Sequence, residues 1–235
     1  MTLKASTSSD ANLPYPDPHY YRWLADSLNY LTITRPDIAY VANQVCQHMH
    51  HPTILKCFLR YIQGTIHFGL PLTTTPLQLR TYSDADWAGD PHDRKSTTGF
   101  CTFLGTTPIS WCVKKQATVT KTSTKAEYRS LSSATSDVIW IQRLLADFQL
   151  PPTTPTPLYC NNTSAMAIAH HPVFHARTKH IEIDYHFIRH HITNGEIVLH
   201  HIYSEEQPAD LLIKPLPSSR FQDLRDKLSI KLINA

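Results

Sequence analysis

From Leu77 onward, apolar and polar residues follow two patterns in succession, first one with the period of a strand and then one with the period of a helix. Up to Val113, apolar and polar residues roughly alternate in short runs, which predicts strands with one buried face. From Lys125, apolar residues recur every three or four positions, which predicts a long helix with one buried stripe. The predicted elements are strands at Leu77–Ser83, Thr98–Leu104 and Thr107–Val113, a helix at about Lys125–Phe148, a strand at Leu158–Asn161, helices at Ser164–His170 and about Ile181–Ile192, and a strand at Ile197–Tyr203.

This order of elements predicts the fold class. Three strands in succession pair most simply as an antiparallel meander, whereas a strand that follows a long crossover helix pairs in parallel. We therefore expect an α/β fold with a five-stranded mixed sheet flanked by helices, antiparallel first and parallel afterwards.

A different pattern precedes the sheet. Residues 1–19 are rich in Ser, Pro and Asp, and we expect a flexible segment there. Residues 20–76 read as a small helical piece and a linker, with one helix starting at Pro36 and another running from about Thr53 to Gln63. Residues 77–235 would then form the sheet-containing domain.

Composition narrows the class of protein without deciding it. The 235 residues carry a formal charge of +3 with 15 neutral His, which suits a phosphate-facing surface but does not demand one. The five cysteines form no CxxC pair, so we expect reduced thiols and an intracellular protein, cytoplasmic or nuclear. The apolar runs are too short to span a bilayer, so we expect no membrane partner.

Three acids are candidates for a shared site: Asp84 after the first strand, Glu127 at the head of the long helix, and Asp210 before a short helix. Converging carboxylates bind hard divalent cations, so the expected ion is Mg²⁺ or Mn²⁺. Each acid also has a structural interpretation. Asp84 could be a turn residue, with Asp86 as the first acid instead. Glu127 could close a capping box with Thr124, and Asp210 could stabilise a helix N-terminus through the macrodipole.

Several separate blocks of sequence carry a family resemblance, and they follow one another in order at suitable spacing. The chain resembles the ribonuclease H region of copia-type retrotransposon Pol polyproteins, preceded by the end of the reverse transcriptase and its connection. The blocks are LTITRPDIAYVANQV, LRYIQGTIHFGL, YSDADWAGD, RKSTTGFCTFLG, ISWCVKKQ, KAEYRSL, FHARTKHIEIDYHFIRHH and QPADLLIKPL.

The resemblance implies a ribonuclease H fold and hydrolysis of the RNA strand of RNA–DNA hybrids with two Mg²⁺ ions. It implies metal ligation by Asp84, Glu127 and Asp210, with the reverse transcriptase part of the same polyprotein as a partner. No Tyr-x-Asp-Asp sequence is present, which excludes polymerase chemistry for this chain.

Asn161 departs from the family pattern, which calls for an acid at that catalytic position. An amide keeps the shape but loses one negative charge, so we expect weak metal binding and weak or absent hydrolysis. The alternative is a catalytically decayed remnant that still binds nucleic acid. A glycosidase with paired acids has no support beyond the presence of carboxylates.

Basic residues supply the expected contacts to nucleic acid. Arg177, Lys179 and His180 precede a predicted helix, where phosphate binding is favoured. Further cations flank the long helix, although for any single Lys a solvated surface is the better interpretation: Lys114, Lys115, Lys121, Lys125 and Arg129.

Overall fold

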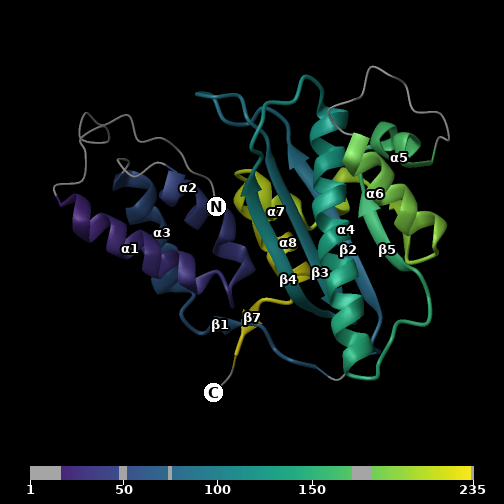
Figure 1. Ribbon diagram of the computed structural model, residues 1–235. Coiled ribbons are helices and arrows are strands. Elements are labelled where there is room, and N and C mark those ends of the chain that lie inside the picture. The colour runs from purple at the N-terminus through teal and green to yellow at the C-terminus, as the bar shows by residue number, and fades with distance from the viewer. Residues whose placement is uncertain (1–16, 48–51, 74–75, 171–181, 234–235) are drawn as a thin grey trace. The chain divides into compact units, whose positions relative to one another are not determined.

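The computed structural model describes residues 17–47, 52–73, 76–170 and 182–233. The chain divides into two compact units. Unit 1 combines residues 1–72 with residues 214–235, and unit 2 comprises residues 73–213. Each unit has its own hydrophobic core. Figure 1 shows the helices and strands of both units.

Unit 1 is mainly helical. Asp17 caps its first helix by accepting hydrogen bonds from the backbone N–H groups of His19 and Tyr20. Residues 18 and 19, expected in a flexible segment, therefore form the first turn of that helix. Its helices are α1 (Pro18–Leu31), η2 (Pro36–Ile38), α2 (Ala39–Gln47), α3 (Pro52–Gly64) and α8 (Ser218–Lys227), and its strands are β1 (Phe68–Gly69) and β7 (Lys231–Leu232).

The C-terminal segment packs within unit 1, although the sequence placed it with the sheet. Phe221 makes an edge contact with Tyr61 of α3, and β7 pairs antiparallel with β1 through Phe68 and Leu232. Leu224 and Leu228 are fully buried. The spacing of these two leucines indicates a short helix in the sequence. It does not indicate which part of the molecule that helix packs against.

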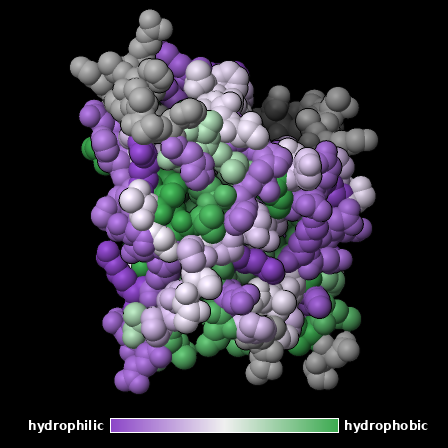
Figure 2. All heavy atoms as spheres, turned by 90° about the vertical axis from the view of Figure 1, so that its right-hand side faces the viewer, coloured by the Kyte–Doolittle hydropathy of each residue, from purple (hydrophilic) through white to green (hydrophobic). Residues whose placement is uncertain are grey.

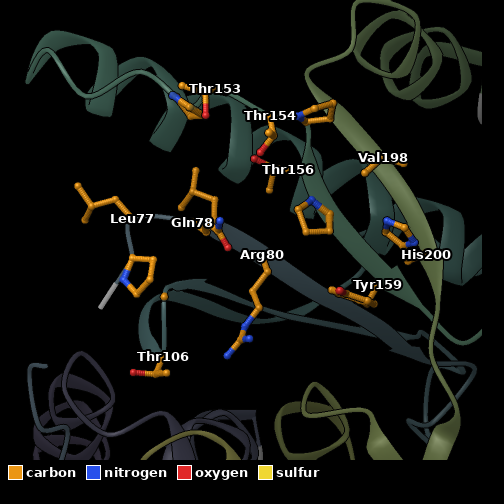
Figure 3. A pocket seen from close by; sticks show the side chains of 16 residues that line it. Leu77, Gln78, Arg80, Thr106, Thr153, Thr154, Thr156, Tyr159, Val198 and His200 are labelled. Atoms are coloured by element: carbon orange, nitrogen blue, oxygen red, sulfur yellow. The ribbon is translucent and has the colours of Figure 1, made fainter. Parts of the chain in front are cut away.

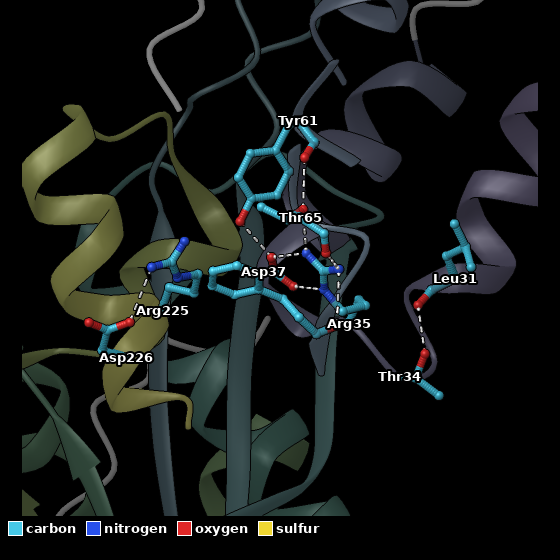
Figure 4. Close-up of polar contacts among 9 residues, drawn as sticks. Leu31, Thr34, Arg35, Asp37, Tyr61, Thr65, Arg225 and Asp226 are labelled. Carbon is cyan, nitrogen blue, oxygen red and sulfur yellow. Dashed lines mark hydrogen bonds and ion pairs between the residues drawn. The ribbon is translucent and has the colours of Figure 1, made fainter. Parts of the chain in front are cut away.

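A buried ion pair stabilises the start of η2 in unit 1 (Figure 4). Arg35 donates from Nε and Nη2 to the two carboxylate oxygens of Asp37, at 2.8 and 2.7 Å. Its remaining donors reach the backbone oxygen and the hydroxyl of Thr65 at 2.9 and 3.0 Å. The Tyr61 hydroxyl donates to Asp37 at 2.7 Å, so this acid is fully engaged.

Unit 2 contains the predicted five-stranded mixed sheet, in the order β4-β3-β2-β5-β6. The pairs β2–β3 and β3–β4 are antiparallel, whereas β2–β5 and β5–β6 are parallel, which confirms the predicted fold class. The strands are β2 (Leu79–Asp86), β3 (Thr97–Leu104), β4 (Thr107–Lys115), β5 (Thr156–Cys160) and β6 (Ile197–His201).

Helices pack against both faces of this sheet. The long helix α4 (Ser123–Asp147) buries the predicted stripe that contains Leu131, Val138 and Ile141 against β2 and β3. Asp137 of α4 accepts hydrogen bonds from Thr102 and Ser110, and burial raises its pKa. The remaining helices of unit 2 are α5 (Thr163–His170), α6 (Glu182–Thr193), η4 (Ser204–Glu206) and α7 (Asp210–Ile213).

The side of unit 2 that carries α5 and α6 is largely hydrophilic, with one hydrophobic area in its middle (Figure 2). In the described ranges, no helix combines the length and the apolar character needed to cross a bilayer. All five cysteines have free thiols.

Candidate nuclease-like acidic edge

Asp84 lies near the carboxyl end of β2, on the central strand of the sheet. It is 2% exposed, and its Oδ1 accepts a hydrogen bond from the backbone N–H of Ala85. Its backbone oxygen accepts a hydrogen bond of 2.7 Å from the hydroxyl of Ser130, which lies on α4. The helix and the strand are thus tied together at the position of this acid.

Gly99 allows the short helix α7, which begins with Asp210, to approach this position. Gly99 pairs with Asp84 across β2 and β3. A Cβ at Gly99 would overlap Ile213 and lie 3.1 Å from Leu212 Cβ, so α7 packs directly on the glycine backbone. Asp210 is buried at the start of α7, on the sheet face where Gly99 lies. Its position at a helix N-terminus agrees with the macrodipole interpretation as well as with a site.

Glu127 belongs to the first turns of α4 and is 7% exposed. The helix begins at Ser123 with Thr122 as its N-cap, whose hydroxyl accepts from the Lys125 N–H at 3.3 Å. The capping box with Thr124 is therefore wrong, because the helix starts two residues earlier. Glu127 instead heads the buried stripe of the helix.

Cys160 provides the electrostatic link between two of these acids. Burial and the negative charges of Glu127 and Asp84 together raise the pKa of its thiol to about 12, against a hydrogen bond from the Asn162 N–H that lowers it. Both carboxylates therefore act on the carboxyl end of β5 from neighbouring elements. A buried Cys at this point was not singled out by the sequence pattern.

Asn161 follows Cys160 directly, at the end of β5, and is half-buried. The next residue has a separate structural role: the Asn162 Oδ1 accepts from the Ala165 N–H at 2.9 Å and caps α5. Asp86 lies in the same region, but its carboxylate packs against Gly89, where any Cβ would overlap it.

The three predicted phosphate contacts lie outside the described residues, which omit 171–181. They are Arg177, Lys179 and His180.

Comparison with known proteins gives long alignments to retrotransposon proteins. The chain is 45% identical over 220 residues to the retrovirus-related Pol polyprotein from transposon RE1 of Arabidopsis thaliana, covering 91% of this chain. It is 44% identical over 221 residues to the corresponding protein from transposon RE2 of the same plant, covering 92% of this chain. The chain belongs to the copia-type retrotransposon Pol polyproteins.

This chain spans only 15% of the length of each of those two relatives. No protein-family model matches it. Among solved structures, it is similar to LC11-RNase H1, isolated from compost, with a TM-score of 0.45, 18% identity, and coverage of 58% of this chain and 93% of that one.

We call the end of the sheet near Asp84, Glu127 and Asp210 the acidic edge. Its donor atoms are carboxylate oxygens, which Mg²⁺ and Mn²⁺ prefer. The arrangement of these side chains is the limiting feature. Within residues 17–47, 52–73, 76–170 and 182–233, no group of three or more His, Cys, Asp or Glu side chains is arranged to hold a metal ion. The charges of Glu127 and Asp84 both raise the pKa of Cys160, whereas the Asn161 side chain contributes no charge.

Proposed function

We propose that this chain is the ribonuclease H-like part of a retrotransposon Pol polyprotein that binds RNA–DNA hybrids and hydrolyses their RNA strand weakly or not at all. The observation that carries the proposal is the position of Asn161. It follows Cys160, the residue on which the charges of Asp84 and Glu127 both act, so an uncharged amide stands at the acidic edge.

The family resemblance gives Asp84, Glu127 and Asp210 as the residues that would hold a divalent ion, although these three described side chains are not gathered into one metal-binding group. A bound Mg²⁺ or Mn²⁺ would supply the positive charge that orients an attacking water and stabilises the leaving oxygen. Asn161 offers a neutral carbonyl oxygen in place of an anionic one, so the edge holds one negative charge fewer. That difference weakens the affinity for any dication more than it changes the shape of the site.

A groove of about 500 Å³ beside α4 supports contact with a phosphate backbone. Lys114, Lys115 and Arg129 line it, together with Asp184. Lys115 is already paired with Asp90 and Asp93, and Arg129 donates to Thr118. Lys114 is exposed and has no ion pair within the described part of the chain, so it is the cation best placed to meet a phosphate.

An RNA–DNA hybrid presents phosphates and 2′-hydroxyl groups in a regular A-like geometry, which is read by shape rather than by sequence. We propose that Arg177, Lys179 and His180 add to the contacts of Lys114. The natural partner would be the reverse transcriptase part of the same polyprotein, which produces such hybrids.

The second candidate function is nucleic-acid binding without hydrolysis. The same observation favours it, because binding to phosphates uses cations whereas hydrolysis needs the acidic edge. The two candidates differ only in whether any metal-dependent cleavage remains.

The deciding experiment measures cleavage and binding of one labelled hybrid by the full chain, with Mg²⁺ or Mn²⁺. We expect binding but little or no cleavage, and we expect Asn161→Asp to increase cleavage. The matched control is Asn162→Asp, which adds the same charge one residue away and keeps an oxygen to cap α5.

Strong cleavage by the unaltered chain, abolished by Glu127→Gln, would contradict the role given to Asn161. Binding without cleavage in both the unaltered chain and Asn161→Asp would favour the second candidate. Absence of hybrid binding would overturn both.

A further inference from the structure

A second hollow lies at the opposite end of the strands from the acidic edge (Figure 3). Its volume is about 550 Å³, within the usual range for small-molecule sites. Leu79 and Thr156, the first residues of β2 and β5, line it, whereas Asp84 and Cys160 lie toward the carboxyl ends of the same strands. All of its lining residues belong to unit 2.

The ionisable side chains that line this hollow include basic groups and no acids. Its lining contains the basic side chains Arg80 and His200 and no Asp or Glu. The guanidinium of Arg80 lies 5.2 Å from the centroid of the Phe103 ring. Its Nε is buried, and across the described ranges no acceptor binds this guanidinium. A buried donor without an acceptor is costly, so the site favours an anionic ligand.

A row of rings crosses the sheet beside Arg80. Tyr82 of β2 and Tyr159 of β5 are directly paired and stacked, with centroids 4.9 Å apart and planes inclined by 16°. His200 of β6 continues the row, 5.6 Å from Tyr159 and tilted by 31°. His200 is exposed and stands on an edge strand, so another flat ring can extend the row.

Hydroxyl groups complete the lining. Thr106, Thr154 and Thr156 belong to it, and Figure 3 displays the Arg80 side chain between Thr106 and Tyr159. Threonine hydroxyls both donate and accept, which suits the hydroxyls of a sugar. An apolar peptide would leave the guanidinium without an acceptor, so it fits this lining less well.

We infer that this hollow is a nucleotide-binding site, in which a base stacks on the Tyr159–His200 end of the ring row and a phosphate pairs with Arg80. The nucleotide could be free or could be one unit of a single-stranded nucleic acid. Stacking on aromatic side chains next to a cation is how proteins bind single strands without reading their sequence. The inference does not depend on the acidic edge or on a metal ion.

The test titrates the full chain with AMP and with adenosine, without divalent metal, by isothermal titration calorimetry. We expect AMP to bind about tenfold more tightly than adenosine, because only AMP carries the phosphate. Arg80→Gln should remove this difference, while Arg80→Lys should keep most of it. Arg143→Gln, which removes an exposed cation of α4 outside the lining, should leave the titration unchanged.

Tyr159→Ala should weaken AMP and adenosine by the same factor, about fivefold or more, because it removes stacking rather than charge. If hexaadenylate binds more tightly than AMP and its binding depends on Arg80 in the same way, the ligand is a single strand. Equal affinity for AMP and hexaadenylate would identify free nucleotides. Equal binding of AMP and adenosine by the unaltered chain, or a preference for AMP over adenosine that survives Arg80→Gln, would overturn the proposal.

Discussion

Each unit of this molecule contains buried acidic side chains, and the two sets have different surroundings. In unit 1, Asp37 is engaged on both oxygens by Arg35 and receives a third hydrogen bond from Tyr61. In unit 2, Asp84 and Glu127 both act on the Cys160 thiol and raise its pKa, so like charges share one buried region. The first arrangement neutralises charge within the protein, whereas in the second two acids act on one buried thiol.

The pKa values of the groups beside these acids differ in the same way between the two units. Burial tends to lower the pKa of Arg35, but its hydrogen bonds to Asp37 and the charge of that acid raise the pKa overall. The pKa of Tyr61 is raised by burial and by Asp37, which keeps the phenol protonated as a donor. In unit 2, Asp84 and Glu127 instead raise the pKa of the Cys160 thiol and so suppress its ionisation.

The largest expected effect comes from breaking the neutralised site. Asp37→Ala leaves the Arg35 guanidinium buried without its carboxylate, which should reduce the free energy of unfolding of unit 1 by about 3–5 kcal/mol. Hydrogen exchange read by mass spectrometry measures the effect separately for each unit. Asp26→Ala removes an exposed acid of α1 and should change little. Equal protection in Asp37→Ala and Asp26→Ala would refute the contrast.

An intermediate effect comes from adding charge to the other site. Without metal, Asn161→Asp places another carboxylate near Asp84 and Glu127, and should lower the stability of unit 2 by about 1 kcal/mol. Millimolar Mg²⁺ should restore it, because the cation offsets the repulsion. Urea unfolding with and without Mg²⁺ measures both changes. Asn162→Asp should show neither; if it behaves like Asn161→Asp, the acidic edge is not local to position 161.

The smallest effect concerns an acid that is paired at the surface. The Lys115 ammonium, helped by backbone hydrogen bonds from His92 and Asp93, lowers the pKa of Asp90 to about 2. Because the folded pKa is depressed, this pair stabilises the protein above about pH 4, and the stabilisation is lost as pH falls from about 4 to about 2. Asp90→Asn should flatten the pH dependence of unfolding in that window. An unchanged profile would mean that the pair contributes nothing measurable.

The sheet and its long helix could be predicted because their periodicities are unambiguous. Alternation across Leu77–Ser83 located β2, and the stripe through Leu131 and Val138 located α4 and its buried face. The start of α4 was missed by two residues, since both Thr122 and Thr124 are plausible caps and only the structure selects one.

Other features depend on contacts that no local pattern encodes. The return of residues 214–235 to unit 1 rests on tertiary partners such as Tyr61 and Phe68. The hollow around Arg80 joins β2, β5 and β6, which are far apart in sequence. Gly99 offered a usable signal, because a glycine inside a strand pattern often marks a close approach of another backbone.

The return of the C-terminal segment makes unit 1 a discontinuous domain. The pairing of Gly69 with Lys231 closes a loop of 162 residues, the difference of their numbers, and unit 2 lies within that loop. Closing such a loop in a flexible chain costs about 4–5 kcal/mol of configurational entropy on logarithmic scaling. A folded unit 2 removes much of that freedom in advance. The connectivity therefore links formation of unit 1 to the folding of unit 2. Residues 73–213 form unit 2 as one uninterrupted stretch, whereas unit 1 needs two separate stretches of the chain.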